Sequence, residues 1–208
     1  MAGSDYERLI EEVADAIFSG AVLGASELRT VWQELTQQDH MSNDDAWTIQ
    51  VELVFFLIST ILRDTYTHPL GGQQARDAVQ DDIVSRVIHI MLARSFDWTH
   101  LSARELPDMQ QKQAEHLLRW YNEAELDYGP SHYPAPSEED FVKLVTSGEI
   151  PEDGLAGKLA RRVANATRQG SAAFYSKLIL VALHLYNALA GPALATRLAQ
   201  ARPVGQGG

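Results

Sequence analysis

The chain has 208 residues, of which 45% are hydrophobic and 22% are charged, so it can bury one core of ordinary size. It contains no cysteine, which excludes disulfide bonds, thiolate-bound zinc, iron–sulfur clusters and a cysteine nucleophile. The formal net charge of −11 is unevenly divided: residues 1–153 carry all 28 carboxylates and 10 Lys plus Arg, whereas residues 154–208 carry seven basic residues and no acidic one. This separation predicts a partner of opposite charge, either elsewhere in the chain or on another molecule.

The apolar residues recur with the period of an α-helix, and no segment shows the sustained alternation of a strand. The sequence therefore predicts an all-α fold, a compact bundle of seven to eight helices. We expect a single domain over residues 1–202, with a soft boundary at 129–137 and a disordered tail at 203–208.

Capping residues place the helices of the first half. A capping-box pattern at Ser4 predicts a helix that Gly20 ends, and a second helix is expected over about 26–37. Ser42 or Asn43 should cap a central helix over about 43–66. The run 68–72, His-Pro-Leu-Gly-Gly, interrupts the chain before a helix that reaches about residue 96, so these two should form a helical hairpin.

The signals for the next helix conflict, because Ser102 and Glu105 form a capping-box pattern while Pro107 favours a first helical turn. We place its start near Glu105. Beyond the proline-rich run 129–137, we expect a short helix over 137–147, a basic helix over 153–168 and an apolar helix over 171–200. The helices at 43–66 and 171–200 should be the two largely buried central helices, because apolar residues occupy most of their circumference.

Each of these two helices carries a narrow polar stripe when it is plotted at 100° per residue. If the stripes face each other, six side chains surround a common pocket, in which Glu52, His184 and Lys177 are candidates for acid–base catalysis. The predicted ligand-binding residues are Glu52, Arg63, Tyr66, Lys177, His184 and Asn187. The competing interpretation is a structural network, in which a Glu52–Arg63 or Glu52–Lys177 ion pair fixes the helix register.

The sequence contains no metal motif of the helical-bundle type, since none of the seven histidines follows a glutamate by three positions. We therefore predict no metal and no cofactor. The motifs of serine hydrolases and of dinucleotide-binding enzymes are also missing, which leaves open whether the protein is an enzyme.

The basic segment opens with glycines at the start of a helix, an arrangement that can attract an anion. The predicted anion-binding residues are Lys158, Arg161 and Arg162. A competing interpretation is that this segment docks within the chain, on the carboxylates near the end of the helix that starts near Glu105. Those carboxylates are Glu123, Glu125 and Asp127.

Together these observations favour a cytoplasmic helical protein that recognises a protein or peptide partner, as an adaptor, accessory or chaperone-like factor. The alternative is a small-molecule-binding or acid–base catalytic bundle around Glu52 and His184. Self-association through the C-terminal helix is compatible with either. The net charge argues against nucleic acid as a partner, and the 14-residue apolar run 49–62 is too short to span a membrane.

Overall fold

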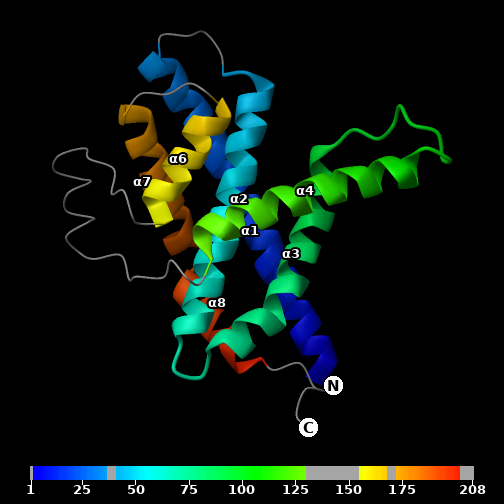
Figure 1. The fold of residues 1–208 in the computed structure, drawn as a ribbon, viewed down its shortest axis with the longest axis vertical. Helices are drawn as coiled ribbons and strands as arrows, with labels where there is room; N and C mark the ends of the chain where they lie inside the picture. The colour runs from blue at the N-terminus through cyan, green and yellow to red at the C-terminus, as the bar shows by residue number, and fades with distance from the viewer. Residues whose placement is uncertain (1, 37–40, 130–154, 168–171, 202–208) are drawn as a thin grey trace.

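The computed structural model describes residues 2–36, 41–129, 155–167 and 172–201 (Figure 1). Within these ranges the chain forms seven helices and no strand, which confirms the all-α helical bundle. The helices are α1 (Ala2–Thr36), α2 (Asn43–Thr67), α3 (Gln73–Ser95), α4 (Leu106–Tyr128), α6 (Leu155–Thr167), α7 (Ala172–Ala188) and α8 (Gly191–Gln200). The predicted helix at 137–147, the tail at 203–208 and nearly all of the proposed boundary at 129–137 lie outside the described residues.

Helix α2 forms the centre of the bundle and contacts each of the other described helices. It starts as predicted, because the Ser42 hydroxyl caps it by accepting a 3.0 Å hydrogen bond from the backbone N–H of Asp45. From Val51 to Leu62 every side chain is buried. A helix that is apolar on all sides is stable only when neighbours surround it, as they do here.

Helix α1 corrects the prediction that Gly20 ends the first helix. The helix continues through Gly20 and Gly24 to Thr36. Gly24 allows close approach to two neighbours, because a Cβ atom there would lie 2.6 Å from Leu185 Cδ1 and 3.2 Å from Leu53 Cδ1. Gly24 therefore provides room for α7 and α2, and the cost of glycine within a helix is offset there by this packing.

The predicted final helix at 171–200 is divided into α7 and α8, which are bent by 51° relative to each other. Ala190 adopts a left-handed conformation with φ of 51°, and Pro192 lies in the first turn of α8, where its missing N–H costs nothing. The Tyr186 ring fills the space that a Cβ atom at Gly191 would need. Helix α7 buries one face, with Phe174 and Leu178 inaccessible, so α2 is the more completely enclosed of the two helices expected at the centre.

Length and composition alone would allow α2 to cross a membrane. However, 78% of its most apolar 18-residue window is buried inside the protein, as expected for a core helix. The bent pair α7 and α8 passes the same test only when both helices are counted as one span.

The two glycines of α1 should respond in opposite ways to substitution. A Cβ atom at Gly20 meets only ordinary contacts, the nearest at 3.6 Å, so Gly20→Ala should stabilise the protein by about 0.5–1 kcal/mol through helix propensity. Gly24→Val should destabilise it by about 1–3 kcal/mol because the added methyl groups overlap Leu185 and Val181. Urea unfolding measures both changes. Equal effects would contradict the close-packing role of Gly24.

Candidate functional site

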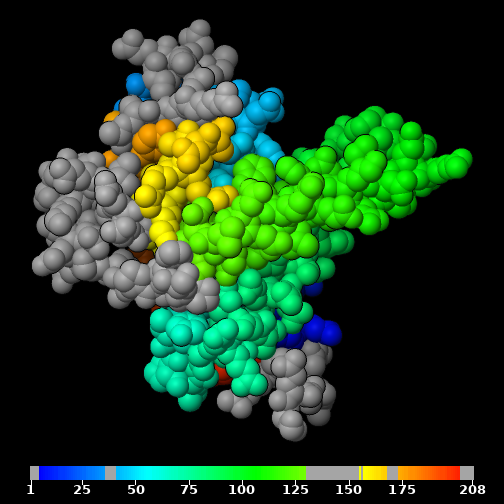
Figure 2. All heavy atoms as spheres, viewed as in Figure 1, coloured from blue at the N-terminus to red at the C-terminus, as the bar shows by residue number. Residues whose placement is uncertain are grey.

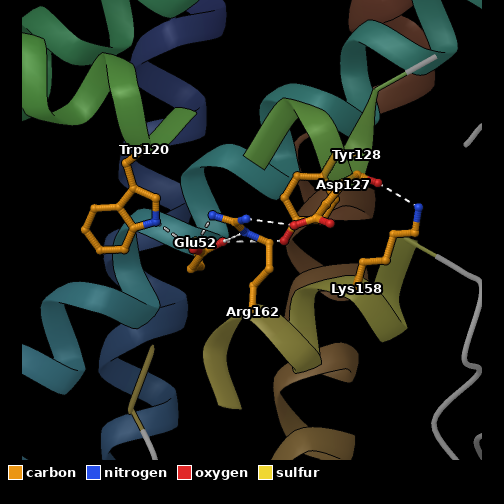
Figure 3. A network of polar contacts seen from close by, with 6 residues as sticks. All are labelled: Glu52, Trp120, Asp127, Tyr128, Lys158 and Arg162. Atoms are coloured by element: carbon orange, nitrogen blue, oxygen red, sulfur yellow. Dashed lines mark hydrogen bonds and ion pairs between the residues drawn. The ribbon is translucent and has the colours of Figure 1, made fainter. Parts of the chain in front are cut away.

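The main polar cluster of the core surrounds Glu52, which is 1% exposed in the middle of α2 (Figure 3). Arg162 of α6 binds this carboxylate with two nitrogens, Nε to Oε2 at 2.8 Å and Nη2 to Oε1 at 3.0 Å. From α4, the indole N–H of Trp120 donates to Oε1 at 2.8 Å, and the Tyr128 hydroxyl donates to Oε2 at 3.5 Å. One carboxylate thus joins three helices, and both of its oxygens are satisfied.

Burial and charge determine how the groups around Glu52 hold their protons. Burial of the Arg162 guanidinium alone would lower its pKa, but the hydrogen bonds and negative charge of Glu52 outweigh this effect and raise the pKa. The pKa of Tyr128 is raised well above 10.0, first by complete burial and then by the charge of Glu52. Arg162 therefore stays charged and Tyr128 stays neutral, so both keep the protons that they donate in hydrogen bonds to Glu52.

The same arginine reaches the end of α4, where its Nη1 donates to Asp127 Oδ2 at 2.8 Å. Lys158 of α6 donates to the backbone carbonyl of Asp127 at 2.7 Å. These contacts confirm, at Asp127, the interpretation that the basic segment docks on α4. Arg162, one of the three residues of the predicted anion site, thus has its positive charge neutralised within the chain, and anion binding by Lys158, Arg161 and Arg162 stays a prediction.

A second polar cluster holds α4 on α3. Arg76, buried near the start of α3, forms an ion pair with Glu125, the next acidic residue of α4 before Asp127. The other carboxylate oxygen of Glu125 accepts from the Tyr121 hydroxyl at 3.2 Å, and that hydroxyl accepts from the amide of Gln80 at 3.0 Å. The C-terminal half of α4 is therefore anchored to α2, α3 and α6.

The structure does not bring the two predicted polar stripes together. Lys177, His184 and Asn187 lie on the exposed face of α7, whereas Glu52 is enclosed by α4 and α6. Within α2, Arg63 pairs with its neighbour Asp64 at 2.8 Å, and Tyr66 is 36% exposed. The prediction that the two stripes face each other around a common pocket is thus wrong. A helical wheel identifies a polar face without identifying the neighbour that covers it.

The interpretation of Glu52 as part of a structural network was correct, but its partner was not identified. Neither Arg63 nor Lys177 is that partner; it is Arg162, 110 positions away in the sequence. One signal in the sequence indicated a partner in the C-terminal segment. A carboxylate within an apolar helix requires a cation, and the basic residues of segment 154–208 have no acidic residue within that segment. Ligand binding by the six predicted residues stays a prediction. Among the described residues, no group of three His, Asp or Glu side chains could hold a metal ion.

An open groove of about 440 Å³ lies where α1, α2 and the C-terminal end of α3 meet. Sequence reasoning did not find it. We call it the junction groove; its lining residues are Phe18, Val22, Ala25, Ser26, Arg29, Asn43, Ala46, Trp47, Gln50, Arg94 and Ser95. An aromatic cluster adjoins it, since the Trp47 ring packs edge-on against Phe96 at 5.2 Å and Phe96 stacks on Trp98 at 5.2 Å. The lining contains two arginines and no carboxylate.

A second groove, of about 500 Å³, lies between α1 and α3 and differs in its charge. Its lining carries three carboxylates, Glu7, Glu11 and Asp82, and one arginine, Arg86. Glu11 pairs with Arg86, and Asp82 accepts a 2.7 Å hydrogen bond from the Tyr6 hydroxyl. Acidic residues therefore outnumber arginines in this groove, unlike in the junction groove.

The N-terminal half of α4 projects from the body of the protein (Figure 2). None of residues 106–116 is buried, and the first buried side chain of the helix is Leu117. We call residues 106–116 the arm. The predicted capping box forms just before it, with the Ser102 hydroxyl accepting from the Glu105 N–H at 3.3 Å and the Glu105 carboxylate accepting from the Ser102 N–H at 3.2 Å. Pro107 lies in the first turn, so both start signals are satisfied.

Comparison of the chain with protein-family models, with curated proteins and with solved structures finds no match. Inferences about its function therefore depend on the arrangement of its own residues.

Removal of one partner of the buried ion pair should be costly. Arg162→Met leaves Glu52 buried without its cation, and Glu52→Gln places an amide N–H₂ among donors, so each should destabilise the protein by about 3–5 kcal/mol. The double variant should recover part of this loss, which a double-mutant cycle in urea unfolding would show. Glu123→Gln, on the exposed face of α4, is the control and should change stability by less than about 0.5 kcal/mol.

Tyr128 should remain protonated in alkaline solution for as long as the protein is folded. Its folded pKa lies above the unfolded value of 10.0, so the contribution of Tyr128 to stability should be constant below pH 10 and should fall as the pH rises further. Ultraviolet titration measures the ionised phenols: at about pH 11, native wild type and Tyr128→Phe should show the same number, whereas in urea the wild type should show about one more. A difference between the native proteins would contradict the buried position of Tyr128.

Proposed function

We propose that the protein is a helical interaction factor that binds a protein or peptide partner, with the arm of α4 as part of the binding surface. The observation that carries this proposal is the projection of the arm. Met109 is an exposed apolar side chain on the arm, and Leu118, which is 45% exposed, lies two residues beyond it. Such side chains on a projecting helix favour contact with another macromolecule.

The energetics of an unpacked helical segment support this interpretation. Most helical stability in proteins comes from the packing of one face, and none of residues 106–116 is buried. The arm has local stabilisation from its capping box and from a 2.9 Å hydrogen bond between Gln111 and Glu115, one turn apart. These contributions are small, and a partner that covers one face would supply the missing packing.

The core polar cluster supports a binding role rather than acid–base chemistry around Glu52. The Glu52 carboxylate accepts hydrogen bonds from an arginine, an indole and a phenol, and Glu52 is inaccessible to solvent. A general base must reach the proton that it abstracts, and a group enclosed by its own donors cannot do so without rearrangement.

Single substitutions on the arm and immediately after it should identify the face that binds. Met109 and Leu118 are nine positions apart and therefore lie on opposite sides of the helix, so Met109→Glu and Leu118→Glu test the two faces separately. Affinity capture from an extract of the source cells, followed by mass spectrometry, should retain a protein with wild type that one of these variants loses. The same substitution at Leu70, which is 59% exposed in the turn between α2 and α3, is the matched control.

The control tests the role of the arm directly. Leu70 belongs to the turn at the opposite end of α3 from the arm (Figure 1). Leu70→Glu should retain the partner as wild type does. If all three variants retain the same proteins as wild type, the arm is not the binding surface. If the partner is a second copy of the chain, light scattering on the purified protein should detect the self-associated form. The arm variant that loses the partner should then lose this self-association as well.

A further inference from the structure

We propose that the junction groove binds an acidic segment of the partner protein, with a carboxylate at Arg29 and an apolar side chain against Val22 and Trp47. This proposal rests on the proposed function, because it takes the occupant to be part of a protein partner. The groove adjoins the C-terminal end of α3, from which residues 96–105 lead to the arm. One partner could therefore contact both surfaces.

The charge of the groove is unlike that of the rest of the protein. The chain carries 28 acidic and 17 basic residues, yet the groove is lined by Arg29 and Arg94 and by no acidic residue. Arg94 pairs with Asp15 at 2.6 Å and lies 5.8 Å from the centroid of the Phe18 ring. Its charge is thus partly compensated and its position is fixed.

Arg29 is the arginine available to a ligand. It is exposed, and its Nη2 donates to the side-chain oxygen of Asn43 at 3.1 Å. Within the described residues no carboxylate forms an ion pair with it. A guanidinium has five N–H donors and binds a carboxylate with two parallel hydrogen bonds, so donors remain for a ligand.

The apolar part of the lining selects against a simple inorganic anion. Phe18, Ala25 and Ala46 are buried or partly buried around the groove, while Val22 is 38% exposed, and its neighbour Leu23 is 68% exposed. The flanking polar groups, Ser26, Gln50 and Ser95, can hydrogen-bond to a peptide backbone. An apolar surface beside a cation suits a peptide that presents a carboxylate and a hydrophobic side chain together.

The net charge of −11 repels an acidic partner only at long range. At physiological ionic strength the screening length is about 8 Å, so a carboxylate within the groove interacts mainly with Arg29 and Arg94. Binding should therefore be weak at low salt, where the whole protein repels the ligand, and should not be abolished by moderate salt. This dependence is opposite to that of a ligand attracted by the net charge.

Fluorescence anisotropy with defined peptides tests the proposal. The probe is the fluorescein-labelled peptide Asp-Glu-Phe-Leu-Glu-Asp-Phe, and its matched version carries Asn and Gln in place of the acids. The acidic peptide should bind at least about tenfold more tightly than the amide version, the effect of one charge-assisted contact. Arg29→Gln should remove this preference, and Arg29→Lys should restore part of it. Arg8→Gln, also exposed on α1 but outside the groove, is the control.

Three results would overturn the proposal: no binding of the acidic peptide up to millimolar protein, equal affinity for both peptides, or equal effects of Arg29→Gln and Arg8→Gln. Phenylacetate provides a carboxylate and a ring without a peptide. If it displaces the peptide at equal concentration, the groove is a site for small organic acids and the assignment to a peptide is wrong.

The test separates this proposal from the proposed function. If an arm variant loses a captured protein but Arg29→Gln retains it and the acidic peptide does not bind, only the groove proposal fails. If the peptide binds in an Arg29-dependent way but no captured protein depends on the arm, the role of the arm fails while the groove proposal stands.

Discussion

The ion pair between Glu52 and Arg162 is the interaction on which the arrangement of this bundle depends. A carboxylate in the middle of the most enclosed helix is costly to bury, and it is stable there because α6 supplies a cation and α4 supplies two further donors. The positions of α4 and α6 on α2 are consequently coupled. Arg162 also binds Asp127 at the end of α4, and the separate Arg76–Glu125 pair holds α4 on α3.

The unequal distribution of charge along the chain is compensated by contacts between distant segments. Arg162 neutralises carboxylates of α2 and α4, and Arg197 of α8 pairs with Glu12 of α1 at 2.9 Å. The exposed pairs contribute little individually, because solvent screens them. Their value lies in orientation, since they bring the C-terminal helices onto the acidic first half of the chain.

Local signals in the sequence predicted those features that local physics determines. The starts of α2, α3 and α4 follow from three local signals, each of which acts within a few residues. They are a serine cap, a proline–glycine turn and a capping box, respectively. Gly20 was interpreted wrongly because a glycine that ends a helix and a glycine through which the helix continues look alike in sequence. The helix continues because α1 packs on α2, α3 and α7, most of which lie far along the chain. The partner of Glu52 was missed for a similar reason, as helix rotation depends on packing. The arm could not be foreseen, because periodicity does not show whether a helical face is covered.

The one-sided anchoring of α4 gives the protein a lever. The arm extends about 16 Å beyond the anchored half of the helix, at a rise of 1.5 Å per residue. A force applied at its tip becomes a torque about Tyr121 and Tyr128, which are packed on Phe55 and Phe56 of α2. Mechanical load on the arm is thus transmitted to the centre of the core, and the lever is held in place by both anchors of α4, at Glu52 and at Arg76.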